Sequence, residues 1–199
     1  MARYRHYRNP KQAGVPVFVT TTVLDFIHAF HREQVRDAMV FHLLRECRLQ
    51  KAVLYGYVVM PHHLHLLLRP APDDSISAFM KLFKPNTSRE ILKLLTPAET
   101  AMFDEQRGLN GNTFWQRSFR SIVIESEEML QQKVAYIHQN PVRAGYVETE
   151  EDYRWSSARG YLSGLVSETS GIDYVRAADS LKTWAATHQS LGYRRLEAF

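Results

Sequence analysis

The residues best suited to chemistry are two histidines that stand two positions apart at the start of an apolar run. His63 and His65 follow Pro61, and a single leucine, Leu64, separates them. Side chains of a β-strand alternate between its two faces, so both imidazoles would project from one face while Leu64 enters the core. Two imidazoles fixed on a rigid strand supply half of a metal site. The alternative is a pair of partly exposed strand histidines that bind no ligand.

A second set of reactive residues recurs at helical spacing. Lys133, Tyr136 and Asn140 are three and four positions apart, so they would line one face of a helix. In a functional interpretation Tyr136 is a nucleophile and Asn140 offers an amide oxygen as a third metal ligand. Lys133 would lower the cost of forming a phenolate or neutralise a phosphate. The alternative is a partly buried tyrosine on a helix that ends at an asparagine.

Hydrophobic patterning predicts the elements that would position these residues. Alternating and β-branched residues predict strands over 14–24, 53–60, 63–69 and 119–125. Apolar residues at helical spacing predict helices over 32–48, 76–83 and 87–95. Pro85 would separate the last two, and residues 96–113 would form a loop with a short helical piece. The helix that carries Tyr136 begins after Ser126, and Pro141 should end it at Asn140.

The order strand, helix, strand, strand, helix, strand is that of the ferredoxin-like fold. It predicts an α+β domain with an antiparallel sheet and helices on one face. The helix that carries Tyr136 is an addition to this pattern and would lie against the sheet near the histidines. Residues 1–147 would form the domain, and residues 148–199 would form a C-terminal extension packed on it or next to it.

Composition limits the class of protein. The chain has 199 residues, of which 45% are hydrophobic and 23% charged, as in an ordinary globular domain. The sequence contains neither an apolar run of the length that a membrane helix needs nor a hydrophobic signal core at its N-terminus. The single cysteine, Cys47, cannot form an internal disulfide, which fits a reducing compartment. The sequence therefore predicts a cytoplasmic protein without a membrane partner.

Basic residues point to a polyanionic partner. The net charge is +4, and Arg3 and Arg5 alternate with aromatic residues ahead of the first acidic residue. Arginine mixed with aromatic residues suits phosphate contact and base stacking, and the alternative is a solvated tail. We predict phosphate contacts at eight positions, any one of which could instead be a solvated surface charge: Arg3, Arg5, Lys81, Lys84, Arg117, Arg120, Lys133 and Arg143.

Four ordered motifs carry a resemblance to a known family. Met-Pro-x-His-x-His-x-Leu-Leu is followed by Trp-Gln-Arg-x-Phe, by Tyr-Ile-x-x-Asn-Pro-Val-Arg-Ala-Gly and by Trp-Ser-Ser. Together these motifs, within about residues 3–161, resemble the single-tyrosine HUH transposases and, among them, the REP-associated tyrosine transposases. His62 departs from the family, in which asparagine or glutamate is more usual. We expect His62 to face away from His63 and from the metal.

The resemblance implies a mechanism and a substrate. His63 and His65 would be the HUH pair, Asn140 the third ligand of Mg²⁺ or Mn²⁺, and Tyr136 the nucleophile. The two imidazoles would also accept Zn²⁺ or Ni²⁺. Cleavage would leave a 5′-phosphotyrosine and a free 3′-hydroxyl on single-stranded DNA beside a hairpin of a palindromic repeat, on the bacterial nucleoid. A monomer is favoured over a dimer that exchanges the tyrosine helix, since one chain can supply both halves of the site.

Two other functions compete with this interpretation. The first is a non-catalytic nucleic-acid-binding domain, because RNA-recognition sheets with this strand order stack bases on aromatic residues. The central strands lack the Lys/Arg-Gly-Phe-type signature of such domains. The second is a metal-dependent hydrolase that uses water, but the sequence lacks the extra carboxylates that such sites usually recruit. A covalent DNA adduct that survives denaturation would separate the transposase from both.

Overall fold

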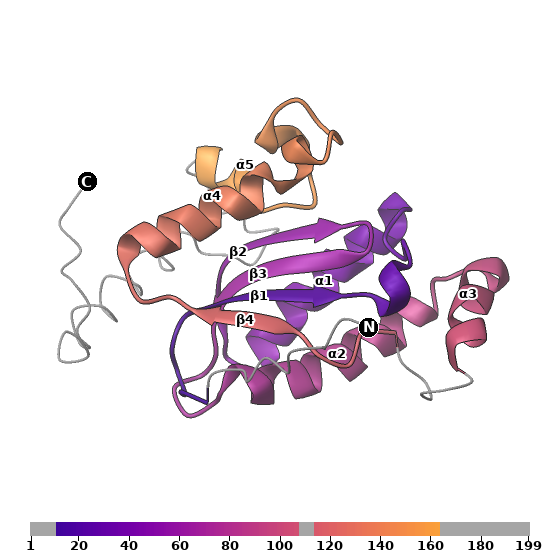
Figure 1. Cartoon of the computed structure of the whole chain (residues 1–199), viewed down its shortest axis with the longest axis horizontal. Helices are drawn as coiled ribbons and strands as arrows, with labels where there is room; N and C mark the ends of the chain where they lie inside the picture. Colours follow the sequence, from indigo (N-terminus) through magenta and orange to yellow (C-terminus); the bar gives the residue numbers. More distant parts are fainter. Residues whose placement is uncertain (1–10, 108–113, 164–199) are drawn as a thin grey trace, which may run out of the picture.

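A four-stranded sheet forms the centre of the computed structural model, which describes residues 11–107 and 114–163 (Figure 1). The strands are β1 (Val17–Thr22), β2 (Val53–Met60), β3 (His63–Arg69) and β4 (Arg120–Val123). All neighbouring strands are antiparallel and their order is β2-β3-β1-β4. This order confirms the predicted ferredoxin-like arrangement.

Helices cover both faces of the sheet. The crossover helices α1 (Glu33–Leu49) and α2 (Ile76–Leu92) lie on one side, whereas α4 (Glu127–Arg143) and the short α5 (Ala158–Ser163) lie on the other (Figure 1). Helix α3 (Pro97–Arg107) extends beyond one end of the sheet, and two 3₁₀ turns complete the fold, η1 (Leu24–Phe26) and η2 (Glu150–Asp152). The predicted class, an α+β domain with one additional helix, is confirmed. No helix in the described part of the chain is long and apolar enough to cross a membrane.

Alternation along β3 separates the core from the candidate site. Leu64, Leu66 and Leu68 are fully buried. The intervening His63 and His65 project from the opposite face and pair across to Thr22 and Thr20 of β1. These three leucines fix the register, because a slip by one residue would turn Leu64, Leu66 and Leu68 away from the core between the sheet and α1 and α2.

Two helices continue through prolines that were expected to end them. Helix α2 contains Pro85, and α4 contains Pro141 and runs on to Arg143. Gly145, with φ of +72°, ends α4 instead. There Tyr146 N donates to Pro141 O at 3.0 Å and Gly145 N donates to Val142 O at 2.9 Å, which is a Schellman cap. The predicted ends were wrong because the apolar contacts of each helix outweigh the one hydrogen bond that a proline removes.

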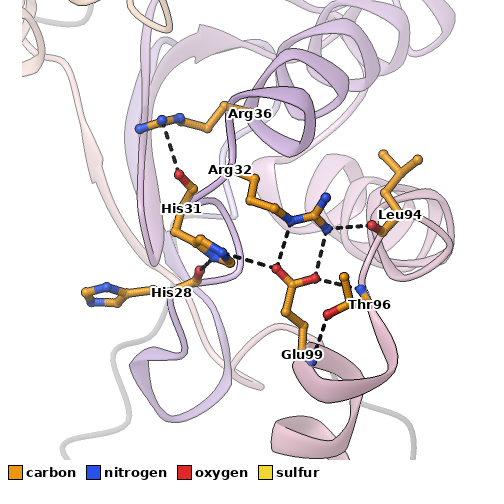
Figure 2. A network of polar contacts seen from close by, with 7 residues as sticks. All are labelled: His28, His31, Arg32, Arg36, Leu94, Thr96 and Glu99. Atoms are coloured by element: carbon orange, nitrogen blue, oxygen red, sulfur yellow. Dashed lines mark hydrogen bonds and ion pairs between the residues drawn. The ribbon is translucent and has the colours of Figure 1, made fainter.

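Residues 96–113 were predicted as a loop with a short helical piece; the structure has an 11-residue helix there, α3, and residues 108–113 lie outside the described residues. A capping box starts this helix: Thr96 N donates to Glu99 Oε2 at 2.6 Å, and Glu99 N donates to Thr96 Oγ1 at 3.2 Å. Arg32 donates to both oxygens of Glu99 at 2.9 and 2.8 Å, and His31 Nε2 lies 3.2 Å from the same carboxylate (Figure 2). This network fixes the loop between β1 and α1.

Residues 153–157, here called the edge segment, run along the free edge of β2. Val59 N donates to Trp155 O at 2.9 Å, and Ser157 N donates to Tyr57 O at 3.0 Å. The indole of Trp155 donates to Asp37 of α1 at 2.8 Å. The edge segment is therefore part of the packed unit, although it follows the boundary predicted at residue 147. Residues 164–199 of the predicted extension lie outside the described residues.

Candidate active site

The histidine pair lies on the sheet face that α4 covers. The ring centroids of His63 and His65 are 4.8 Å apart and their planes are inclined by 75°. Thr20 Oγ1 lies 2.9 Å from His65 Nδ1, which leaves Nε2 of that ring for a ligand. Nδ1 of His63 is buried and has no hydrogen-bond partner among the described residues. A buried polar atom of this kind is costly unless a partner is supplied.

Burial keeps both imidazoles neutral. Desolvation, helped by the neighbouring His62, lowers the pKa of His63 to about 4. Desolvation also lowers the pKa of His65 to about 3, with smaller contributions from His63 and from the Lys133 ammonium. A neutral ring nitrogen carries the lone pair that a cation requires. Near neutral pH the pair is therefore in the protonation state that binds a metal ion.

Helix α4 brings Tyr136 to the same place. Its ring centroid is 5.2 Å from that of His65 and 5.8 Å from that of Phe18, and the side chain is 37% exposed. The next residue, Ile137, is fully buried and sets the rotation of the helix. Ser126 caps the helix by accepting a hydrogen bond from Met129 N at 3.1 Å. A single chain thus brings the tyrosine and the histidine pair together.

Two cations flank the phenol. Lys133 Nζ lies 5.3 Å from the ring centroid of Phe18 and 6.0 Å from that of Tyr136. Arg143 Cζ lies 5.9 Å from the ring centroid of Tyr136. Positive charge at these positions favours a bound phosphate. Lys133 and Arg143 are therefore close to the tyrosine, as their spacing along the helix suggests.

The donors at this site fit a divalent cation with mixed ligands. Within residues 11–107 and 114–163, no group of three or more His, Cys, Asp or Glu side chains is placed to hold a metal ion. The half-buried Asn140 lies one turn beyond Tyr136 on the same face of α4. Two imidazole nitrogens and one amide oxygen would therefore be the protein ligands, and water or phosphate oxygens would complete the shell.

Some of the predicted phosphate contacts lie near this site. Arg120 of β4 pairs with Thr20, so Arg120 and His65 stand in one row across the sheet. Arg117 is exposed and follows Gln116, whose N–H donates to Thr22 O at 2.9 Å. Arg120 therefore lies on the edge strand β4 and Arg117 on the segment that leads into it.

The other predicted contacts are placed differently. Lys81 is exposed on α2, on the far side of the sheet, and the structure does not bring it to the histidines. Lys84 Nζ donates to the carbonyls of residues 116–118 at 2.8, 3.4 and 3.1 Å, and burial lowers its pKa to about 8. Because three carbonyl groups engage its donors, Lys84 is a poor candidate for a phosphate contact. Arg3 and Arg5 lie outside the described residues.

His62 is not turned away from His63, and that expectation was wrong. The two ring centroids are 4.5 Å apart. His62 belongs to the turn between β2 and β3, where the alternation of strand side chains does not apply. Its ring also stacks on His28 at 5.2 Å.

The sequence-based reasoning missed the residues that anchor α4. His138 Nε2 lies 2.9 Å from Ser157 Oγ, and both side chains are buried. Ser157 Oγ also accepts a hydrogen bond from Tyr57 N at 3.0 Å. Ile137 of α4 lies beside Gly56 of β2, where an added Cβ would be 3.7 Å from Ile137 Cδ1, an ordinary van der Waals distance. The Trp-Ser-Ser motif contains Ser157, so it could have indicated this anchor. The sequence does not show that Ser157 contacts His138, because the two residues are 19 positions apart.

Comparison with known proteins identifies similar chains. A protein of Haemophilus influenzae named as a REP-associated tyrosine transposase is 32% identical over 101 residues, which are 50% of this chain and 54% of that protein. The chain thus spans about half the length of this curated relative. A solved structure of a REP-associated tyrosine transposase bound to a REP hairpin superposes with a TM-score of 0.58 and 24% identity, covering 81% of this chain and 87% of the other. This likeness shows a common fold.

The family described as "Transposase IS200 like" matches residues 22–140. The match covers more than half of the chain and contains the histidine pair, Tyr136 and Asn140. The chain belongs to the IS200-like transposase family.

Proposed function

We propose that the protein is a metal-dependent endonuclease and strand transferase that acts on single-stranded DNA beside a hairpin. One observation carries the proposal: in a single chain, the centroid of the Tyr136 ring lies 5.2 Å from that of a neutral His65 and within about 6 Å of two cationic groups, Lys133 Nζ and Arg143 Cζ. A nucleophile, a cation site and positive charge for a phosphate thus occupy one surface. We propose that it acts in the cytoplasm, where such DNA is accessible.

Tyr136 Oη would attack the scissile phosphorus while the bond from phosphorus to the 3′ oxygen breaks. The phenolic proton goes to solvent, and the departing 3′ oxygen takes up a proton, so the products are a 5′-phosphotyrosine and a 3′-hydroxyl. Lys133 and Arg143 would stabilise the phenolate and the negative charge of the phosphate. The reverse attack by a 3′-hydroxyl rejoins DNA without a nucleotide cofactor, because the tyrosine ester keeps the bond energy.

His63, His65 and Asn140 would hold a divalent cation, Mg²⁺ or Mn²⁺. When bound, this ion supplies Lewis acidity at a non-bridging oxygen of the phosphate. The unpartnered Nδ1 of His63 and the lowered pKa values of both histidines support this assignment. Thr20 would orient His65 through its hydrogen bond to Nδ1.

The substrate follows from the relatives. The solved structure that shares this fold holds a REP hairpin, and the curated relative is named for REP. We therefore propose that the substrate is a palindromic repeat folded as a hairpin with an unpaired extension. A monomer is the proposed active unit, because one chain contributes the histidines, the tyrosine and the asparagine.

A covalent trapping experiment tests the reaction. Labelled hairpin DNA is incubated with protein and Mn²⁺, denatured, and examined for DNA that migrates with the protein. We expect the wild-type protein to form the adduct and Tyr136→Phe to bind DNA without forming it. Tyr146→Phe is the matched control, because Tyr146 is also exposed but follows the end of α4. An adduct with Tyr136→Phe would exclude the assigned nucleophile, and binding without an adduct by the wild type would indicate a non-catalytic DNA-binding protein.

A further inference from the structure

Three aromatic side chains beside the histidine pair have no part in the proposed chemistry. Phe26, His28 and His62, here called the aromatic platform, come from the loop after β1 and from the turn between β2 and β3. The His28 and His62 rings stack with centroids 5.2 Å apart and planes inclined by 13°. The rings of Phe26 and His62 are in an edge-to-face arrangement, with their centroids 5.7 Å apart.

The backbone under the platform is strained. Asp25 and Phe26 have φ of +47° and +59°, which is the left-handed region that L side chains rarely adopt. Burial does not offset this cost, since the Phe26 side chain remains 61% exposed. Residues with strained backbone conformations cluster at active sites and ligand-binding sites.

Hydrogen bonds hold the platform in place. Phe26 N donates to Val23 O at 3.1 Å, and Val23 N donates to His62 O at 2.8 Å, so the two loops of the platform are joined. Beyond them the Arg32–Glu99 network fixes the next residues of the loop, and the His28 imidazole points away from that network (Figure 2). The exposed rings are therefore preorganised for a ligand.

The platform is continuous with the candidate active site. The ring centroids of His62 and His63 are 4.5 Å apart, and those of His63 and His65 are 4.8 Å apart. Rings thus form an unbroken row from the proposed cation site to the surface. A phosphate placed at the histidine pair would bring a neighbouring nucleotide of the same strand to the platform.

We propose that the aromatic platform stacks an unpaired base of the DNA strand next to the scissile phosphate. The location of that phosphate rests on the proposed function. A base fits better than a protein partner, because the platform is a few rings wide and adjoins a phosphate site, whereas protein interfaces need a larger apolar patch. Stacking on aromatic rings accepts every base, so the platform would position the strand without reading its sequence.

The test uses Tyr136→Phe, which retains intact DNA. Hairpin oligonucleotides with an unpaired extension carry 2-aminopurine at each unpaired position in turn. We expect binding to quench the fluorescence at one or two adjacent positions. Adding Phe26→Gly should remove this quenching and weaken binding of the extension roughly tenfold, while a hairpin without an extension should bind as before.

Phe26→Gly separates loss of stacking from loss of folding. Glycine accepts a positive φ without strain, so the variant should melt no lower than the parent protein. Phe26→Asn, which also tolerates this conformation, is the second variant. Phe41→Ala is the matched control, because Phe41 is 63% exposed but lies on α1, away from the histidines.

The proposal that the platform stacks a base would be contradicted if 2-aminopurine fluorescence were still quenched in Phe26→Gly, or if no position of the extension were quenched in the parent protein. The covalent adduct of the wild-type protein reports on the proposed function separately. A covalent adduct without fluorescence quenching would contradict the base-stacking proposal and leave the proposed function intact. Quenching without an adduct keeps the platform as a base-stacking site and contradicts the catalytic proposal.

Discussion

The two imidazoles of the candidate site differ in how their Nδ1 atoms are bonded. In His65 this atom faces the Thr20 hydroxyl at 2.9 Å, whereas in His63 it has no partner among the described residues. The alternation of β3 predicted that the two rings share a face. It did not predict Thr20, because the register between β1 and β3 is set by contacts that the sequence of one strand does not contain.

Thr20→Val tests whether this hydrogen bond orients a metal ligand. Valine has nearly the same shape but no hydroxyl, so His65 would keep its position and lose its fixed tautomer and orientation. Loss of such an outer partner typically weakens metal binding 10- to 100-fold, and we expect a change of that order. Mn²⁺ affinity measured by electron paramagnetic resonance is the readout, with Thr149→Val as the control. Unchanged affinity for Mn²⁺ in Thr20→Val would show that the hydroxyl does not support a bound cation.

At the scale of elements, α4 depends on the edge segment. Sequence periodicity predicted the helix and the buried position of Ile137. It could not predict the contact between His138 and Ser157, since that contact forms only when the chain returns along β2 after η2. The predicted end of α4 at Asn140 was wrong for a related reason. Tertiary packing and the Gly145 cap, rather than the low helix propensity of Pro141, decide where α4 ends.

Ser157→Ala should reduce both stability and turnover. The substitution leaves the buried Tyr57 N–H and His138 Nε2 without their common partner, which costs about 1–3 kcal/mol of unfolding free energy. A shift of α4 would also misplace Tyr136, so we expect kcat to fall more than KM rises. Denaturant unfolding and cleavage kinetics measure the two effects, with Ser88→Ala of α2 as the control. A loss of stability with wild-type kcat would mean that this anchor does not position the tyrosine.

The Glu99 carboxylate attaches α3 to Arg32, and its contribution to the stability of the protein should vary with pH. The hydrogen bond from Arg32, followed by those from Thr96, lowers the pKa of Glu99 to about 2. Because the folded state favours the ionised form, the stabilisation is complete above the ordinary pKa near 4.5 and is lost as the pH falls toward 2. Glu99→Gln should therefore be less stable than the wild type at pH 6, and the gap should narrow below pH 4.5. Chemical unfolding across this range tests the expectation, and a gap independent of pH would contradict it.

At the scale of the whole molecule, the strand and helix order was sufficient to predict the sheet, and the motifs were sufficient to predict the family. The sequence was not sufficient to show how α4 sits on the sheet. The edge segment joins α4 to β2 and also binds α1 through Trp155 and Asp37. Both layers of helices are thus attached to the strand that adjoins the histidines.

Mixing two inactive variants tests whether each molecule completes its own site. Tyr136→Phe lacks the nucleophile and His63→Ala lacks one imidazole, so a molecule of either kind cannot cleave. Helix α4 contacts β2 of its own chain through Ile137 and through the His138–Ser157 bond. We therefore expect no cleavage after the two variants are unfolded and refolded together, with refolded wild-type protein as the control. Dimers that exchange α4 would instead combine an intact tyrosine with an intact histidine pair, and recovered cleavage would show that the working site is shared between two chains.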